Sequence, residues 1–180
     1  PNKATCSFIV TVTDTELPNC GELTPVQYDA PGVTVGPGEV GTSVIDVPDD
    51  FQVGDVNLLN LSGTHDDMGQ VVMKLMGPGN SGLMIKGACI GEADFDFNLD
   101  NLATQNILDA PCGPLGGGGT YQAIDDLTDF VGGNSQGQWV LTIANADPQS
   151  TLVLDDWILE LSQAIPYSQM DTIIPHDPGE

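Results

Sequence analysis

The sequence predicts an all-β fold, a jelly-roll-like β-sandwich preceded by an extended N-terminal strand. No stretch keeps the 3.6-residue period of an amphipathic helix, and short alternating runs lie between clusters of Gly, Pro, Asn and Asp. The 26 acidic residues comprise 20 Asp and 6 Glu, and Asp favours turns and caps whereas Glu favours helices. Hydrophobic residues make up 40% of the 180 residues, which is enough for one well-cored domain.

The first two predicted strands differ in their pattern. Residues 7–13 are rich in β-branched side chains and alternate, with Phe8, Val10 and Val12 on one side. Residues 56–61 are apolar on both faces, which indicates a strand in the middle of a sheet. The sequence therefore predicts one amphipathic strand near the start of the chain and one central strand later.

Three further predicted strands alternate regularly, at residues 70–76, 138–144 and 156–161. A tight Gly-Pro-Gly-Asn turn follows the first of them. The glycine-rich segment 113–119 predicts a loop. The apolar side chains that we expect inside the sandwich are Trp139, Leu141, Trp157, Leu159, Leu58 and Val72.

The composition divides the chain into four segments. Residues 1–17 hold the N-terminal strand, and residues 18–40 are rich in Pro and Gly, which predicts a linker with some extended pairing. Residues 41–162 hold the sandwich. Residues 163–180 are polar and contain Pro, which predicts an extended C-terminal arm. Because the chain starts at Pro1 with no signal peptide, we expect a mature or excised segment.

The charge balance excludes several classes of partner. The net charge is −23, with three lysines and no arginine, so neither nucleic acid nor an anionic membrane surface is an expected partner. No apolar run reaches the roughly 18 residues that span a bilayer, so we expect no membrane insertion. The acidic surface could serve solubility in salt, and divalent cations would relieve its self-repulsion. These two explanations are compatible.

Four cysteines indicate an oxidising, extracellular compartment. Their even number in a loop-rich chain predicts two disulfides. Three pairings are possible, and the local one joins neighbours in sequence. A zinc site is the alternative, but no Cys-x-x-Cys occurs and both histidines lie far from any cysteine in the sequence. The cysteines of the local pairing are Cys6 with Cys20, and Cys89 with Cys112.

An ordered set of motifs extends over residues 41–161 and includes both tryptophans. The motifs are, in order, strand 56–61, Thr64-His65-Asp66, residues 71–80, Leu99-Asp100-Asn101-Leu102-Ala103, Gly119-Thr120-Tyr121-Gln122-Ala123, residues 127–132, Gly137-Gln138-Trp139-Val140-Leu141 and Leu154-Asp155-Asp156-Trp157-Ile158-Leu159. This set resembles the P domain, also called Homo B, of kexin- and furin-like proprotein convertases. The family's basic residues are absent here, and Gly69-Gln70-Val71 stands where the family usually has Gly-Asp-Leu.

The resemblance implies a jelly-roll-like domain without catalytic machinery, which accompanies a serine-protease domain in the convertases. The sequence itself predicts no enzyme. His65 and His176 are the only histidines that could act as a general base, and no Gly-x-Ser-x-Gly elbow occurs. Adjacent acids could suggest a glycosidase, but neighbouring residues in a strand point to opposite faces.

Clustered loop carboxylates predict calcium as the cofactor. Calcium takes six to eight oxygen ligands, and no contiguous EF-hand loop occurs, so separate loops would have to supply them. For each residue alone, a solvated surface is the alternative. The candidate ligands are Asp66, Asp67, Glu92, Asp94, Asp96, Asp100, Asp125 and Asp126.

The N-terminal strand resembles a second family. Residues 4–16 are similar to the last strand of a hyalin-repeat (HYR) module, and the rest of such a module is missing. An isolated amphipathic strand is unstable in water, so it must pair with its own sandwich or with a neighbouring subunit. The assembly strand that we expect is carried by Phe8, Ile9, Val10 and Val12.

These observations predict an extracellular structural or adhesive module that binds calcium. Its expected partners are other copies of itself, joined into a surface filament by exchange of the N-terminal strand, or neighbouring surface-protein domains. One alternative is an accessory P domain of a secreted serine protease. Another is a carbohydrate-binding module, which would need exposed aromatic residues from Tyr28, Tyr121, Tyr167 or the phenylalanines.

Overall fold

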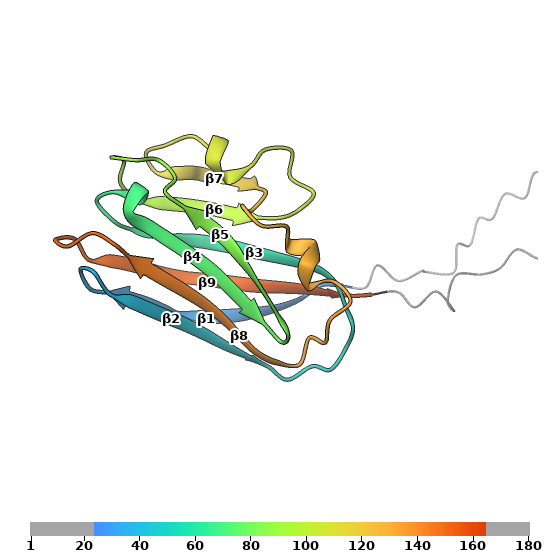
Figure 1. Cartoon of the computed structure of the whole chain (residues 1–180). Helices are drawn as coiled ribbons and strands as arrows, with labels where there is room; N and C mark the ends of the chain where they lie inside the picture. Colours follow the sequence, from blue (N-terminus) through green and yellow to red (C-terminus); the bar gives the residue numbers. More distant parts are fainter. Residues whose placement is uncertain (1–23, 165–180) are drawn as a thin grey trace, which may run out of the picture.

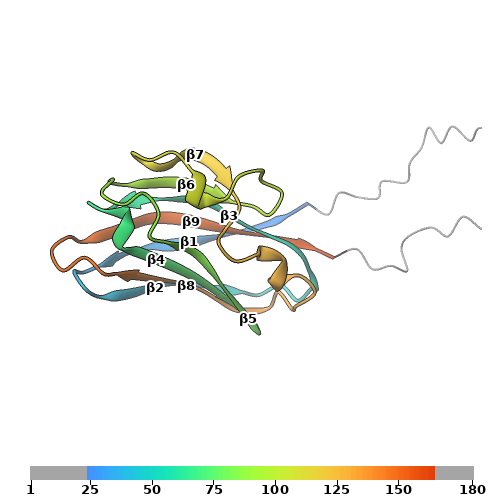
Figure 2. The same cartoon turned by 45° about the horizontal axis from the view of Figure 1, so that its top comes forward.

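A computed structural model describes residues 24–164, and these residues form an all-β sandwich of two sheets, as the sequence predicts. Figures 1 and 2 show the two layers with their strands running across the molecule. Three short 3₁₀ turns connect the strands: η1 (Met68–Gln70), η2 (Ile107–Asp109) and η3 (Leu127–Phe130). Within the described residues, no helix is long and apolar enough to cross a membrane.

The first layer, sheet A, contains five strands in the order β1-β9-β3-β6-β7. Neighbouring strands are antiparallel except β6 and β7, which run parallel. The strands are β1 (Val26–Val35), β3 (Val53–Thr64), β6 (Phe95–Leu99), β7 (Leu115–Tyr121) and β9 (Leu152–Gln163).

The second layer, sheet B, contains four antiparallel strands in the order β2-β8-β4-β5. Strands β2, β4 and β8 alternate between side chains that face the core and side chains that face outward. Strand β5 has a register shift, at which Met84 and Ile85 are both buried. The tight turn predicted at residues 77–80 joins β4 to β5. The strands are β2 (Val40–Val47), β4 (Val71–Gly77), β5 (Asn80–Lys86) and β8 (Gly137–Asn145).

The core between the sheets contains both tryptophans. Trp139 from β8 and Trp157 from β9 are buried, and so are the predicted core residues Leu58, Leu141 and Leu159. The prediction for Val72 is wrong. Because Val71 and its alternate neighbours on β4 face the core, Val72 points outward and is only half-buried.

A cross-sheet hydrogen-bond chain fixes the Trp157 indole. Its Nε1 donates to Ser43 Oγ on β2 at 2.9 Å, and Ser43 Oγ donates to the Pro31 carbonyl on β1 at 2.6 Å. Both sheets therefore contribute to the site of one buried side chain. The Trp139 indole is satisfied locally, since its Nε1 donates to the Ser135 carbonyl at 2.9 Å.

Two strands occupy segments for which the sequence predicts a linker and a loop. The sandwich includes β1, which falls within the Pro- and Gly-rich segment 18–40, so it begins before residue 41. The glycine-rich segment 113–119, predicted as a loop, contributes most of β7. A Cβ on Gly116 would lie 2.6 Å from Phe97 Cβ, so the glycines allow β7 to approach β6 closely.

Candidate functional sites in the acidic loops

His65 lies at the centre of a buried network at one end of the sandwich. It is 2% exposed, and its Nε2 lies 3.0 Å from Asn145 Oδ1. Its Nδ1 lies 2.8 Å from the Asp67 carbonyl oxygen. Asn145 in turn donates from Nδ2 to the Ser150 carbonyl at 2.8 Å. His65 is thus held between the β3–β4 and β8–β9 connections.

Asp67 joins two of the loops in which the sequence predicts calcium ligands. Its Oδ1 accepts from Gly69 N at 2.9 Å and from Gly91 N at 2.7 Å. The backbone reinforces this contact, because Met68 N donates to the Glu92 carbonyl at 2.9 Å. The structure therefore brings the 66–67 loop against the 91–94 segment, which are about 25 residues apart in sequence.

Asp94 and Asp66 lie beside this junction. Asp94 has a positive φ of 63°, and its Oδ1 accepts from His65 N at 3.3 Å. Asp66 Oδ2 accepts from Ser150 Oγ at 2.6 Å. Glu92 and Asp96 are exposed, and Asp96 stands on β6 opposite Ser62 of β3. These predicted ligands therefore lie in neighbouring loops, with Asp66, Asp67 and Asp94 already engaged in hydrogen bonds.

The other three predicted ligands lie apart from this junction in sequence and in contacts. Asp100 Oδ1 accepts from Leu102 N at 2.7 Å, and Asp125 Oδ2 accepts from Leu83 N at 2.8 Å. Asp126 Oδ1 accepts from Thr128 N at 2.9 Å and from Asn101 Nδ2 at 2.7 Å. Across residues 24–164, no group of three or more His, Cys, Asp or Glu side chains gathers to hold a metal ion. Calcium binding stays a prediction.

A hollow of about 420 Å³ opens beside Asp126. Its polar groups are largely engaged within the protein: Gln122 Nε2 donates to the Ala103 carbonyl at 2.8 Å, and Asn106 Nδ2 donates to the Ala123 carbonyl at 2.9 Å. Hydrogen bonds from Thr128, first that of its backbone N–H, lower the pKa of Asp126. The lining residues are Asn101, Leu102, Asn106, Gln122, Ala123, Ile124, Asp126 and Thr128.

Sequence reasoning did not single out Asn101, Asn106 and Gln122 as lining residues. A partial signal existed for Asn106, whose Oδ1 accepts from Leu108 N and caps η2. The hollow offers amide groups and one carboxylate. Its lining residues do not pair a nucleophile with a base. The groups that they offer can form hydrogen bonds to a bound molecule.

The cysteine prediction is confirmed for one pair. Cys89 and Cys112 form a disulfide that encloses a sequence separation of 23 residues. This bond ties the 87–94 loop to the segment before β7. Cys6 and Cys20 lie outside the described residues, as do His176 and the predicted assembly strand with Phe8, Ile9, Val10 and Val12.

The described aromatic residues are engaged in the fold. Tyr121 is buried and donates to the Gly116 carbonyl at 2.9 Å. Tyr28 is half-buried and donates to Asp49 Oδ2 at 2.7 Å, and burial together with this carboxylate raises the pKa of Tyr28. Tyr167 lies outside the described residues. Between residues 24 and 164, therefore, no exposed aromatic cluster supports carbohydrate stacking.

No model of a known protein family matches the chain, and no curated protein matches it. Among solved structures, the serine protease of Aeromonas sobria is similar at 15% sequence identity with a TM-score of 0.45. A structure of that protease in complex with its chaperone is similar at 12% identity with a TM-score of 0.47. Each match covers 78% of this chain and 28% of the other chain.

Proposed function

We propose that the sandwich is a non-catalytic accessory domain of a secreted protein, which stabilises a folded domain beside it in the same polypeptide. The observation that carries this proposal is the His65 network. The described histidine, which could have served as a general base, is buried and hydrogen-bonded to Asn145 and to the Asp67 backbone. Its polar atoms hold loops together and face no open site.

Two further observations support this function. The Cys89–Cys112 disulfide fits a secreted protein, because disulfides persist in oxidising compartments. The ordered motifs that resemble a P domain fall on the strands and turns of the sandwich, including both core tryptophans. In the convertases such a domain accompanies a serine protease, so a secreted serine protease is the neighbour that we infer.

The test compares the neighbouring domain with and without the sandwich. The complete gene product and a variant that lacks residues 24–164 are purified, and thermal unfolding of the neighbouring domain is followed by calorimetry. We expect the neighbour to unfold at a lower temperature when the sandwich is removed. A gene without a second folded domain would contradict the proposal, and so would an unchanged unfolding temperature.

A second candidate is a calcium-dependent structural or adhesive module of the cell surface. The observation that favours it is the junction at Asp67, which brings the acidic 66–67 and 91–94 segments together. Partner loops that meet in this way could supply carboxylate and carbonyl oxygens from separate parts of the chain. Calcium is the cofactor of this candidate, and its effect on stability is the deciding measurement.

The surface-filament hypothesis belongs to the same candidate. It requires exchange of the strand at residues 7–13, which lies outside the described residues. Electron microscopy of the full chain with calcium should show fibres, and deletion of residues 1–14 should abolish them while the circular dichroism of the sandwich is kept. Fibres that persist after the deletion would exclude strand exchange as their cause.

A further inference from the structure

The outward face of sheet B differs from the rest of this acidic molecule. Alternation on β2, β4 and β8 places one set of side chains outward, and a register shift in β5 puts Lys86 on the same side as Leu83. The outward side chains therefore align in rows across the sheet. The first row is Val40, Ala144, Val72 and Lys86; the second is Thr42, Thr142, Lys74 and Leu83; the third is Val44, Val140, Met76 and Ser81; and Asp46 with Gln138 forms the last.

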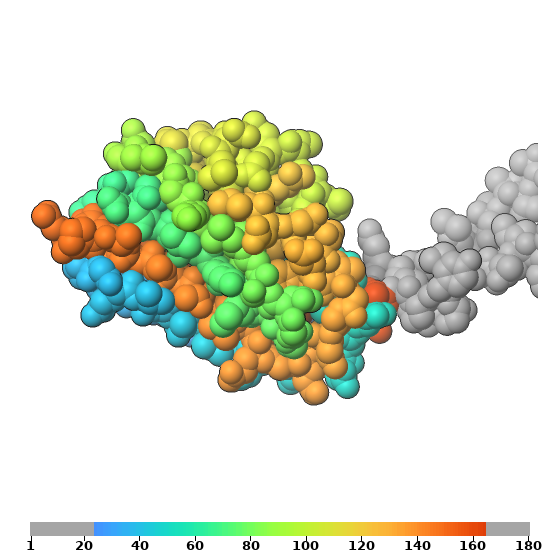
Figure 3. All heavy atoms as spheres, in the orientation of Figure 1, coloured from blue at the N-terminus to red at the C-terminus, as the bar shows by residue number. Residues whose placement is uncertain are grey.

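Apolar side chains on this face are open to solvent. Val40 is 65% exposed, Met76 39% and Val44 37%. A shallow hollow of about 600 Å³, lined in part by Met76 and Val140, contains no charged side chain. Figure 3 shows β4 and β5 in green and β8 in orange across the middle of this face. Contiguous exposed apolar surface of this kind marks a binding site in soluble proteins.

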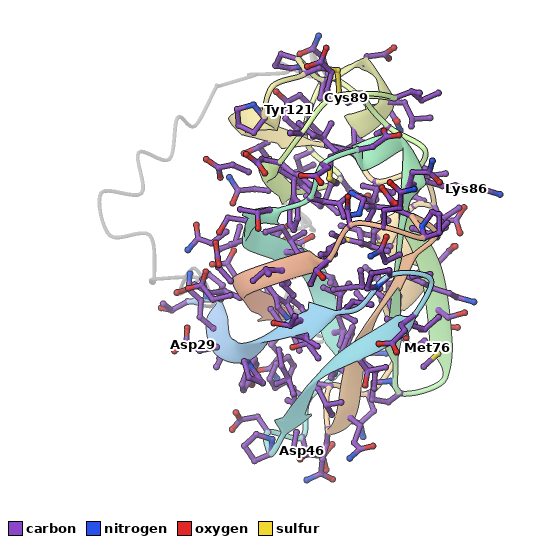
Figure 4. All side chains as sticks on the ribbon, turned by 90° about the vertical axis from the view of Figure 1, so that its left-hand side faces the viewer. Asp29, Asp46, Met76, Lys86, Cys89 and Tyr121 are labelled. Atoms are coloured by element: carbon purple, nitrogen blue, oxygen red, sulfur yellow. A yellow bond between two sulfur atoms is a disulfide. The ribbon has the colours of Figure 1, made fainter. Side chains whose placement is uncertain are left out.

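The charges are divided between the two outer faces. Both lysines of the described chain, Lys74 and Lys86, lie on sheet B, and Asp46 is the one carboxylate that its strands direct outward. Figure 4 shows Lys86 and Met76 on one flank and Asp29 on the opposite flank. The carboxylates on the strands of sheet A, all exposed or half-buried, are Asp29, Asp55, Asp96, Asp155, Asp156 and Glu160.

We propose that this face binds a second copy of the chain in a two-fold symmetric dimer. Each copy carries a net charge of −23, so most approaches oppose carboxylates to carboxylates. Contact through sheet B avoids this repulsion and buries the exposed valines of both copies. The dimer goes beyond the accessory function, because it does not depend on any neighbouring domain.

The positions of Lys86 and Asp46 fix the geometry of the dimer. They stand at diagonally opposite corners of the face, at the end of β5 and near the end of β2, and Figure 4 shows them well separated. Strand spacing and rise make the face about 14 Å by 20 Å between these corners. A two-fold axis along the other diagonal brings each Lys86 within side-chain reach of Asp46 on the other copy, twice per dimer.

This axis also matches the apolar residues. Strands of the two copies then cross at about 70°, which is closer to the orthogonal than to the aligned arrangement of stacked sheets. Met76 lies on the axis and meets its own copy, and Val44 faces Val72. Lys74 lays its aliphatic stem against Val140 of the other copy, while the ammonium extends toward the solvent.

The test measures self-association of the full 180-residue chain by sedimentation equilibrium at physiological salt. Wild type should form dimers. Lys86→Glu and Asp46→Lys should each weaken the dimer Kd by about tenfold or more, because both symmetric contacts become repulsive. An equimolar mixture of the two variants should restore wild-type affinity, since each mixed dimer then contains two attractive pairs.

A variant in the middle of the proposed interface and a control for folding complete the experiment. Val140→Asp should abolish dimerisation, and the unfolding midpoint of each variant at high dilution should stay close to that of wild type. A wild-type chain that stays monomeric up to high micromolar concentration would overturn the proposal. The partner of this face would then be a different protein. Variants that weaken the dimer without restoration in the mixture would overturn the proposed two-fold arrangement.

Discussion

At the scale of single residues, the acidic side chains of this protein divide into those that organise loops and those that only carry charge. Asp67 belongs to the first group, because one of its oxygens accepts backbone hydrogen bonds from two different loops. Asp126 Oδ1 likewise accepts two hydrogen bonds, one from the Thr128 backbone N–H in η3 and one from the Asn101 side-chain amide. The sequence shows both as acids in loops, but it does not show which ones accept hydrogen bonds.

Asp67→Ala should lower the free energy of unfolding by about 1–3 kcal/mol, because it leaves the Gly69 and Gly91 amides without their acceptor. Asp67→Asn keeps an acceptor oxygen and should cost less. Urea unfolding followed by tryptophan fluorescence measures both. Asp66→Ala is the matched control, since Asp66 makes one exposed hydrogen bond to Ser150. Equal losses for Asp66→Ala and Asp67→Ala would show that the two hydrogen bonds of Asp67 stabilise the fold no more than the single exposed hydrogen bond of Asp66.

Asp126 predicts a pH dependence whose sign follows from its hydrogen bonds. Its pKa is lowered in the folded protein from the ordinary value of 3.8, chiefly by the Thr128 backbone N–H. A lowered pKa contributes stability above the ordinary value, and this contribution is lost as the pH falls through the folded pKa. Wild type should therefore lose more stability below about pH 4 than Asp126→Asn, which keeps an oxygen acceptor but does not titrate.

Unfolding midpoints measured between pH 5 and pH 2 check this expectation. Asp29→Asn is the control for charge alone, because Asp29 is an exposed residue on the edge strand β1. If the two asparagine variants follow the same curve, the hydrogen bonds of Asp126 have no part in the acid response.

At the scale of elements, some strands have a burial pattern that can be predicted from their sequence, and others do not. Strand β8 alternates strictly around Trp139, and β9 alternates from Asp156 onward, so these buried faces are predictable from the sequence. Strand β7 was not, because its glycines carry no apolar pattern and their role is close approach to Phe97. Strand β1 contains Pro31 and Gly32, which mark loops in isolation, yet it pairs along β9 at the sheet edge, where proline is tolerated.

Within the candidate sites, the sequence predicts the acidic residues but not the amide side chains. The sequence predicts ligands in the Asp66/Asp67 loop and in the segment from Glu92 to Asp96, and the structure places the start of that segment against the 66–67 loop. Amide side chains such as Asn101 and Gln122 carry no such mark, and they meet because loops about 20 residues apart fold against each other. Val72 was assigned to the core although the strict alternation of β4 excludes it.

Trp157→Ala should cost about 3–5 kcal/mol, because the side chain is completely buried between the sheets and its loss leaves a large cavity. Trp157→Phe should cost less, since it removes the hydrogen bond to Ser43 but fills most of the space. Guanidinium unfolding followed by circular dichroism measures both variants. A loss below about 1 kcal/mol for the alanine variant would mean that β9 is not part of a packed core.

At the scale of the whole molecule, net charge and fold oppose each other. A charge of −23 favours an expanded chain, and the core, the disulfide and the loop hydrogen bonds oppose this expansion. The carboxylates are spread over sheet A and the connecting loops, whereas sheet B directs one outward. Cations in the medium should consequently affect stability more than they do in a neutral domain.

Calcium at millimolar concentration should raise the unfolding temperature of the full chain above its value in chelator, because a ligand of the folded state stabilises it by mass action. Sodium chloride at equal ionic strength is the control for charge screening, and magnesium is the control for divalent charge. Elemental analysis of the purified protein detects ions that chelator does not remove. Identical curves in calcium and in the sodium control, with no bound metal, would exclude a calcium site.

The neighbouring first and last strands determine how the domain would respond to tension. Val26 stands opposite Leu161, so β1 begins at the end of sheet A where β9 finishes, and the two strands run antiparallel. Force applied through residues on either side of the sandwich would therefore pull both strands at the same end. The β1–β9 hydrogen bonds would therefore break one after another from that end, because the force acts on one pair at a time. A polypeptide that contains this domain would lengthen under low force by peeling β1 away, long before the tryptophan core gives way.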